Sequence, residues 1–297
     1  MYIIKHILMG KVKVTEDVKR NVIDFYLSKP MTYKCICEKF DLCEPTVMKI
    51  LKDIPKYTRA KINSPNLNES IFEEINDEMS AYFLGLIISD GNVFEYNGGD
   101  RRQDSVSITL QECDEYLLDE FRKWTKTSTN VTGDGRGSST IAVRSNKVSE
   151  NLKKWGVVPR KSFITYLPKI DDKYMSHLIR GIYDGDGSIR FDRTSRRYVK
   201  YMTICGSEKL IYDVVEYISN RLELSSKPHI YSYKDRVLFE FKLHNYADMK
   251  SFGDFMYKDS TIYLKRKREK YDAFLKAYEN YNDNTEISIE SKESIPS

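Results

Sequence analysis

The chain has 297 residues, of which 40% are hydrophobic, and a formal net charge of +4. It contains no run of about 18 apolar residues, so the sequence gives no sign of a membrane span, and its apolar start lacks the cleavage site of a secretory signal. The five cysteines follow no framework spacing. We therefore expect reduced thiols and a cytoplasmic protein.

Positive charge gathers near the N-terminus. Residues 1–62 hold 13 lysines and arginines against 7 acids, whereas residues 279–297 hold five acids and one lysine. A basic module favours a polyanionic partner, although a solvated surface would give the same count. The polar segment 279–297 is expected to be disordered.

Residues 11–56 predict a small all-α domain of three helices. Thr15 and Thr32 are suited to cap the first two helices, Asp41 to form a tight turn, and Pro45 to begin the third helix. The stretch resembles the helix-turn-helix domains of recombinases and small regulators. A helical bundle without a ligand is the alternative. The residues expected to contact DNA from the third helix are Thr46, Lys49 and Lys52.

Residues 57–78 follow as a predicted linker, and an internal repeat begins at residue 79. The hydrophobic periodicity predicts two units of the order α-β-β-α-β-β-α, over 79–170 and 171–278. Their strands alternate apolar and polar residues, as in sheets with one packed and one solvated face. We therefore predict an α+β fold with two pseudo-symmetric units after the small all-α domain.

The first helix of each unit carries small residues four positions apart, in the sequences LGLIISDG and IRGIYDGDG. Residues at i and i+4 share a helix face, so each helix presents a stripe that permits close backbone approach. The two helices are expected to pack directly on each other at the centre of the molecule. The predicted interface residues are Gly85, Ser89, Gly181 and Gly185.

Asp90 and Asp186 each lie one residue beyond this stripe, at the helix C-terminus, with Gly91 and Gly187 following as left-handed caps. A carboxylate there opposes the helix dipole, at a cost of about 0.3–1 kcal/mol. Two facing carboxylates, together with exposed helix-end carbonyls, form a hard-oxygen site suited to Mg²⁺ and to phosphodiester hydrolysis. A solvated Asp-Gly turn is the alternative for either one alone.

The two runs resemble the motifs that name the LAGLIDADG family of homing endonucleases. The first copy has Ile88 where the motif has its first acid, whereas the second copy keeps Asp184 as well as Asp186. The resemblance implies paired αββαββα repeats whose sheets form a saddle over DNA. It also implies that Asp90 and Asp186 are catalytic and bind the metal, and that Asp184 has a supporting role.

The resemblance extends to segments 153–168 and 256–271, which end the two repeats. Family members place a basic residue near each scissile phosphate, where a cation stabilises the transition state. This implies catalytic roles for Lys161 and Lys265, with Arg160 and Lys267 as rivals. Outward strand residues would contact bases. They are Ser107, Thr109, Gln111, Arg144, Tyr201, Thr203, Tyr231, Tyr233 and Lys242.

The sequence thus predicts a site-specific double-strand DNA endonuclease that uses Mg²⁺ or another divalent cation such as Mn²⁺. As one chain with two motifs it is expected to act as a monomer on double-stranded DNA. The gene is expected to belong to a mobile element, such as an intron that moves by homing. The protein is expected to associate with the nucleoid of a bacterial or phage-infected host. The alternative is an inactive DNA-binding regulator or RNA-splicing maturase on the same scaffold. An intein is rejected because no splicing blocks flank the motifs.

Overall fold

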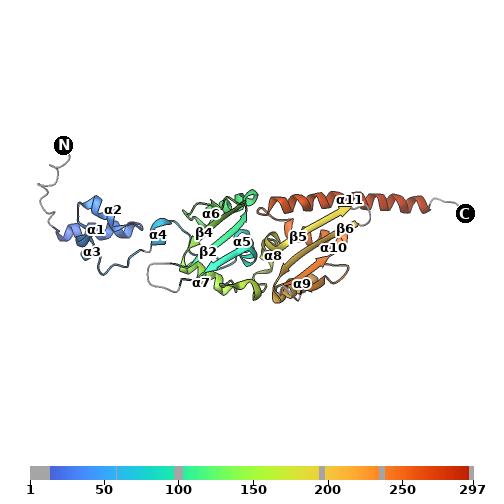
Figure 1. The fold of residues 1–297 in the computed structure, drawn as a ribbon, viewed down its shortest axis with the longest axis horizontal. Coiled ribbons are helices and arrows are strands. Elements are labelled where there is room, and N and C mark those ends of the chain that lie inside the picture. Colours follow the sequence, from blue (N-terminus) through green and yellow to red (C-terminus); the bar gives the residue numbers. More distant parts are fainter. Residues whose placement is uncertain (1–13, 58, 97–102, 194–197, 234–237, 294–297) are drawn as a thin grey trace, which may run out of the picture.

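The computed structural model describes residues 14–57, 59–96, 103–193, 198–233 and 238–293. Figure 1 shows a small group of helices at one end, two sheets on either side of a central helix pair, and a long helix leading to the C-terminus. No helix in the described ranges has the length and apolar character needed to cross a membrane.

The N-terminal group consists of α1 (Glu16–Ser28), α2 (Tyr33–Phe40) and α3 (Glu44–Ile50). The hydroxyls of Thr15 and Thr32 accept hydrogen bonds from the first turns of α1 and α2, and Asp41 takes a left-handed conformation with φ 49° between α2 and α3. These helices share a hydrophobic core of their own, which is separate from the main core. Its fully buried members are Val22, Tyr26, Ile36, Val47 and Leu51.

The segment predicted as a linker contains the short helix α4 (Arg59–Asn63), and its second half is packed against the first repeat. Phe72 is fully buried in the main core, and its carbonyl accepts a 2.8 Å hydrogen bond from the Trp155 indole. Asn151 donates to the carbonyls of Glu69 and Ile71. This half is therefore part of the packed structure, because its apolar residues bury surface that a free linker would leave in water.

Each repeat has the predicted αββαββα order. The first contains α5 (Glu78–Asp90), β1 (Gly91–Phe94), β2 (Ser105–Gln111), α6 (Glu115–Thr125), β3 (Thr132–Gly133), β4 (Ser138–Arg144) and α7 (Asn146–Lys154). The second contains α8 (Asp172–Asp186), β5 (Gly187–Arg193), β6 (Tyr198–Gly206), α9 (Glu208–Arg221), β7 (His229–Tyr233), β8 (Leu238–Leu243) and α10 (Tyr246–Tyr257).

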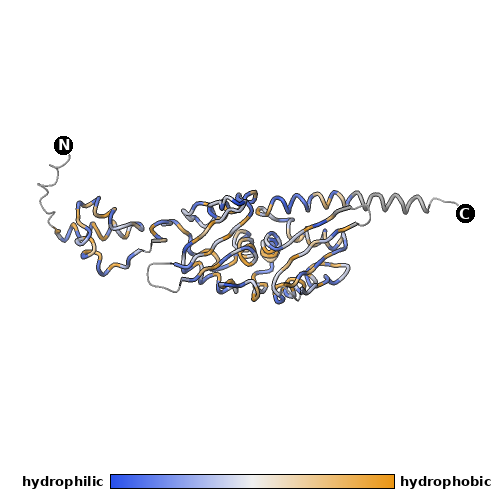
Figure 2. The backbone as a smooth tube through the Cα atoms, viewed as in Figure 1, coloured by the Kyte–Doolittle hydropathy of each residue, from blue (hydrophilic) through white to orange (hydrophobic). Residues whose placement is uncertain are grey.

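The two sheets have equivalent topologies, antiparallel with strand orders β1-β2-β4-β3 and β5-β6-β8-β7. In Figure 2 hydrophobic residues line the central helices and the strands beside them. These residues belong to one continuous core that joins both repeats. The predicted α+β class, with two pseudo-symmetric repeats, is confirmed.

The last helix, α11, spans Lys265–Glu293. Its first half packs on the second repeat through Tyr271 and Phe274, which are buried. The helix continues through most of the range that we expected to be disordered, 279–297, because residues 279–293 include neither glycine nor proline to interrupt it.

Candidate active site

The centre of the molecule is a direct contact between the backbones of α5 and α8. A Cβ atom added to Gly85 would overlap the carbonyl oxygen of Leu178, and one added to Gly181 would overlap that of Tyr82. Each added Cβ would also lie 3.0 Å from the Cα of the other glycine. One turn further, a Cβ on Gly185 would overlap the Ser89 side chain. The small residues singled out in the sequence are therefore the ones that let the helices touch.

This contact brings the ends of both helices together, and with them Asp90 and Asp186. Both residues are exposed, yet neighbouring protein partly desolvates each carboxyl. This partial burial raises the pKa of Asp90, which Lys267, Lys161 and Arg266 counteract. Burial, reinforced by repulsion from Asp90, raises the pKa of Asp186 to about 6. The negative charge of Asp90 therefore contributes to the raised pKa of Asp186.

The glycines after the acids differ from the prediction. Gly91 has φ −79° and Gly187 has φ −96°, so both are extended rather than left-handed. The chain enters the first strand of each sheet directly from the helix. A side chain would not fit there, because an added Cβ would overlap Ile87 at Gly91 and Tyr183 at Gly187.

A buried lysine approaches each acid-bearing helix end. The Lys161 ammonium donates to the Ser89 carbonyl at 3.3 Å. The Lys267 ammonium lies within 3.3 Å of four carbonyl oxygens at the end of α8. Burial lowers the pKa of both lysines, to about 8 for Lys267, while Asp90 and Asp186 favour their charged forms. The two lysines thus place positive charge at the negative ends of two helix dipoles.

The structure corrects the expectation for Lys265. Its side chain is exposed, and its ammonium lies 4.3 Å from the ring centre of Tyr116 rather than beside the acids. Lys267, the predicted rival, occupies the equivalent of the Lys161 position. Residues two apart on a helix point to different sides, and α11 begins at Lys265. Arg160, the other rival, has φ 58° and is exposed.

Some of the helix-end carbonyls that were expected to serve as metal ligands, those of Ser89, Gly185 and Gly187, accept hydrogen bonds from the two lysines, and each keeps a second lone pair. Within the described ranges no three His, Cys, Asp or Glu side chains cluster as metal ligands. The carboxylates of Asp90 and Asp186 remain the expected metal ligands. Such a pair fits Mg²⁺, which commonly takes one or two carboxylates and completes its shell with water and substrate phosphate.

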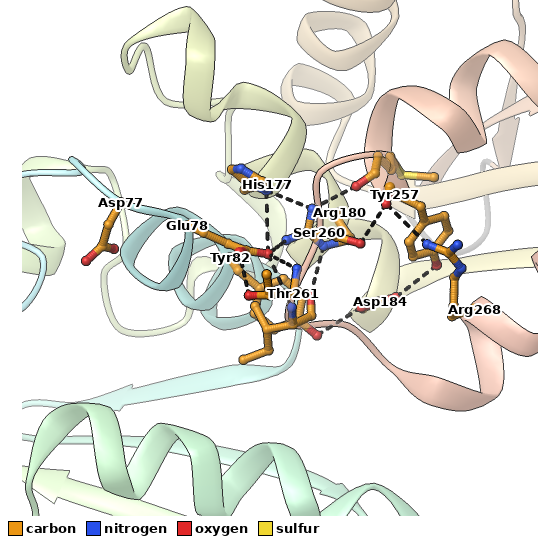
Figure 3. Close-up of polar contacts among 12 residues, drawn as sticks. Asp77, Glu78, Tyr82, His177, Arg180, Asp184, Tyr257, Ser260, Thr261 and Arg268 are labelled. Carbon is orange, nitrogen blue, oxygen red and sulfur yellow. Dashed lines mark hydrogen bonds and ion pairs between the residues drawn. The ribbon is translucent and has the colours of Figure 1, made fainter.

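Asp184 belongs to a buried polar network instead of the acid pair (Figure 3). It accepts hydrogen bonds from the Tyr82 hydroxyl at 2.9 Å and the Leu264 amide at 2.7 Å. Burial raises the pKa of Asp184 to about 6. The supporting role expected for this residue is therefore structural: it joins both central helices to the segment before α11.

The same network contains a residue that the sequence reasoning missed. Arg180 is fully buried and pairs with Glu78 at 2.6 Å, while its other nitrogens donate to the carbonyls of Ile262 and Met256. The sequence does contain a signal for it: Arg180 is the single charged residue in the apolar run LIRGIY. A charge buried with that run requires a partner.

The solvated sheet faces hold most of the residues expected to contact bases. Gln111 and Arg144 are exposed. Lys242 pairs with Glu240 at 3.0 Å and lies about 5 Å from the rings of Tyr201 and Tyr231. Thr203 is different, because it is 3% exposed and its hydroxyl contacts Glu240 and Phe241. It supports its neighbours and is not available to a base.

The N-terminal residues expected to contact DNA lie on α3 or just beyond it. Lys49 and Lys52 are exposed, and Lys52 lies 3.7 Å from Asp53. Thr46 is half-buried, and its hydroxyl contacts the Cys43 sulfur at 3.0 Å. Two of the three predicted positions are therefore open to a ligand.

The duplicated αββαββα units, joined through helices that end in paired acids, have the fold of the LAGLIDADG homing endonucleases. The chain is similar to the meganuclease I-SmaMI bound to uncleaveable DNA, with 12% identity, a TM-score of 0.51, and coverage of 71% of this chain and 91% of that one. It is also similar to the I-SmaMI LAGLIDADG homing endonuclease bound to cleaved DNA, with 15% identity, a TM-score of 0.50, and coverage of 71% and 92%.

Sequence comparison gives a weaker relationship. The chain is 23% identical over 215 residues to DNA-directed RNA polymerase subunit Rpo1C of Methanocaldococcus jannaschii, covering 66% of this chain and 22% of that protein. The chain thus spans about a fifth of the length of that relative. No protein-family model matches the sequence.

Proposed function

We propose that this protein is a site-specific endonuclease that hydrolyses both strands of double-stranded DNA with a divalent cation, Mg²⁺ or Mn²⁺. The observation that carries the proposal is the pair Asp90 and Asp186, held together by helix backbones with a buried lysine at each helix end. The solved structures with this fold that are described as bound to DNA support the choice of substrate.

The charges at this centre suit a phosphodiester substrate. Asp186 is destabilised in its charged form by Asp90 and by burial, so a cation between the carboxylates would relieve their repulsion. When bound, the metal would polarise a phosphate oxygen and lower the pKa of a water molecule. Lys161 and Lys267 hold positive charge beside the acids, where negative charge grows on the phosphate during hydrolysis.

The N-terminal helices are proposed to add a second DNA contact. Lys49 and Lys52 are exposed on or beside α3, in a segment with excess positive charge. A helix of this kind in a major groove would anchor the enzyme beside its cleavage site. The single chain carries two acid-bearing helices, so we propose that it acts as a monomer.

The test is cleavage of a plasmid library of candidate target sites with Mg²⁺. We expect linear product from the parent protein, and a loss of at least about a hundredfold in Asp90→Asn and Asp186→Asn, because each loses a metal ligand that contributes several kcal/mol. Duplex binding, measured without metal by fluorescence anisotropy, should survive in both. Asp119→Asn is the matched control, because Asp119 belongs to a half-exposed ion pair with Arg122 on α6 and not to the acid pair or its supporting network.

Cleavage by both variants at the parental rate would refute the proposed metal site. Binding without cleavage by the parent protein across the library would instead favour the DNA-binding regulator on the same scaffold.

A further inference from the structure

A basic pocket of about 610 Å³ lies at the outer end of the second sheet. Strand β5 leaves the centre at Gly187, and further along the sheet its Phe191 is paired with Lys200 of β6, while Leu243 at the end of β8 is paired with Met202. The pocket forms where these strand ends meet the N-terminus of α10. Its cationic or potentially cationic lining residues are Lys200, Lys227, His229, Lys242 and His244.

The charges of the lining residues favour an anionic ligand. The remaining lining residues include Asn245, Tyr246 and Tyr278, and no aspartate or glutamate lines the pocket within the described part of the chain. Lys242 is already paired with Glu240, and the Lys200 ammonium lies 3.6 Å from the ring centre of Tyr246. Lys227 is exposed. The positive end of the α10 dipole adds to this field.

The first repeat shows what the equivalent position accepts. There the helix N-terminus is that of α7, capped by Ser145, as Asn245 caps α10. The Ser145 hydroxyl donates to the Glu69 carboxylate at 2.6 Å, and Glu69 also pairs with Lys61 at 3.1 Å. In the first repeat the Glu69 carboxylate, from the segment before α5, is therefore the anion at this position. In the second repeat the corresponding place is an open pocket lined by cations.

We propose that this pocket binds phosphate groups of the DNA backbone beyond the outer end of the second sheet. The inference rests on the proposed function, because DNA bound on the solvated sheet faces would place its phosphates beside the pocket. The N-terminal helices and the elements β6 and α10, which contribute to this pocket, lie on opposite sides of the central helices (Figure 1), so together they would extend the DNA contact in both directions.

The test is the salt dependence of binding to a random-sequence duplex, measured without metal. The double variant Lys200→Gln/Lys227→Gln removes two charges from the pocket. Each phosphate that the variant no longer neutralises should reduce the slope of log K against log salt by about 0.9, so a decrease of about 1–2 is expected. The matched control is Arg122→Gln/Lys123→Gln, which removes two charges from another surface pocket and should leave the slope unchanged.

A second measurement locates the contact. Affinity should rise with duplex length up to a plateau, and the pocket variant should reach its plateau at a shorter duplex than the parent and the control. Equal slopes and equal plateau lengths for the two double variants would overturn the phosphate pocket. A parent protein without salt-dependent duplex binding would instead refute the proposed function itself. Thermal melting of each variant verifies that it is folded.

Discussion

The two repeats share a topology but differ in how their central helices are supported. Asp184 and Arg180 of α8 are buried and bind partners from other segments, whereas the equivalent positions of α5, 96 residues earlier as for the two acids, hold Ile88 and Leu84. Among the described residues, Lys267 donates to four carbonyls and Lys161 to one. The acids, the lysines and the small residues, by contrast, are matched in both halves.

This difference distinguishes residues of the proposed site, which both repeats share, from residues that support the structure of one repeat. The matched residues lie at the helix contact or at the helix ends, where the proposed chemistry takes place. The unmatched polar residues of α8 hold Leu264 and Ile262, which precede α11 and its Lys267. The second repeat therefore uses buried polar contacts to position its lysine, and the first repeat uses apolar packing at the same places.

The largest expected effect tests the part that the halves share. Gly85→Val and Gly181→Val should each destabilise the protein by about 3 kcal/mol or more, because the new side chain would overlap a backbone carbonyl that cannot move aside. Thermal unfolding measures the loss. Gly133→Val is the control, because the nearest atom to an added Cβ would be the Ser138 carbonyl oxygen, at 3.9 Å. Unequal losses for the two central glycines would break the proposed symmetry of the contact.

The next effect tests the difference between the lysines. Lys267→Met should cost about 2–3 kcal/mol of stability, because several buried carbonyls lose a charged donor, whereas Lys161→Met should cost less than about 1 kcal/mol. Melting curves at neutral pH compare the two variants. Equal melting temperatures would show that the four contacts of Lys267 contribute no more than the single contact of Lys161.

The smallest effect concerns the acids. The pKa of Asp186 is raised to about 6, so its charged form disfavours folding, and the unfolding free energy of the parent should fall as pH rises from about 4 through 6. Asp186→Asn should therefore be more stable than the parent above pH 6 without metal. We expect about 1 kcal/mol after allowance for solvent screening, and no difference below about pH 3, where the carboxyl is protonated in both states.

Asp90→Asn should gain less stability over the same range. At Asp90 three cations lower the pKa against weaker repulsion from Asp114, whereas at Asp186 repulsion from Asp90 exceeds the effect of either cation, Lys161 or Lys267. Chemical denaturation at a series of pH values measures both variants. A larger gain in unfolding free energy for Asp90→Asn would show that the charge of Asp90, and not that of Asp186, destabilises the folded protein more.

The sequence was sufficient to predict the repeats, the helix contact and the acid pair, because each depends on local spacing. It was insufficient to distinguish Lys265 from Lys267, since that choice depends on where α11 begins and which side then faces the core. The burial of Thr203 depends on Glu240 in another strand. Local periodicity contains no information on that partner.

The glycine contact between α5 and α8 also has a consequence for how such a molecule can change. Because main-chain atoms meet there, the spacing of Asp90 and Asp186 is set by van der Waals contact between the two helix backbones and depends little on side chains elsewhere. Residues on the outer strands of either repeat can therefore diverge without altering the distance between the two acids. If the proposed function is correct, one half could therefore acquire a new recognition sequence while the two cleavage positions stay in register.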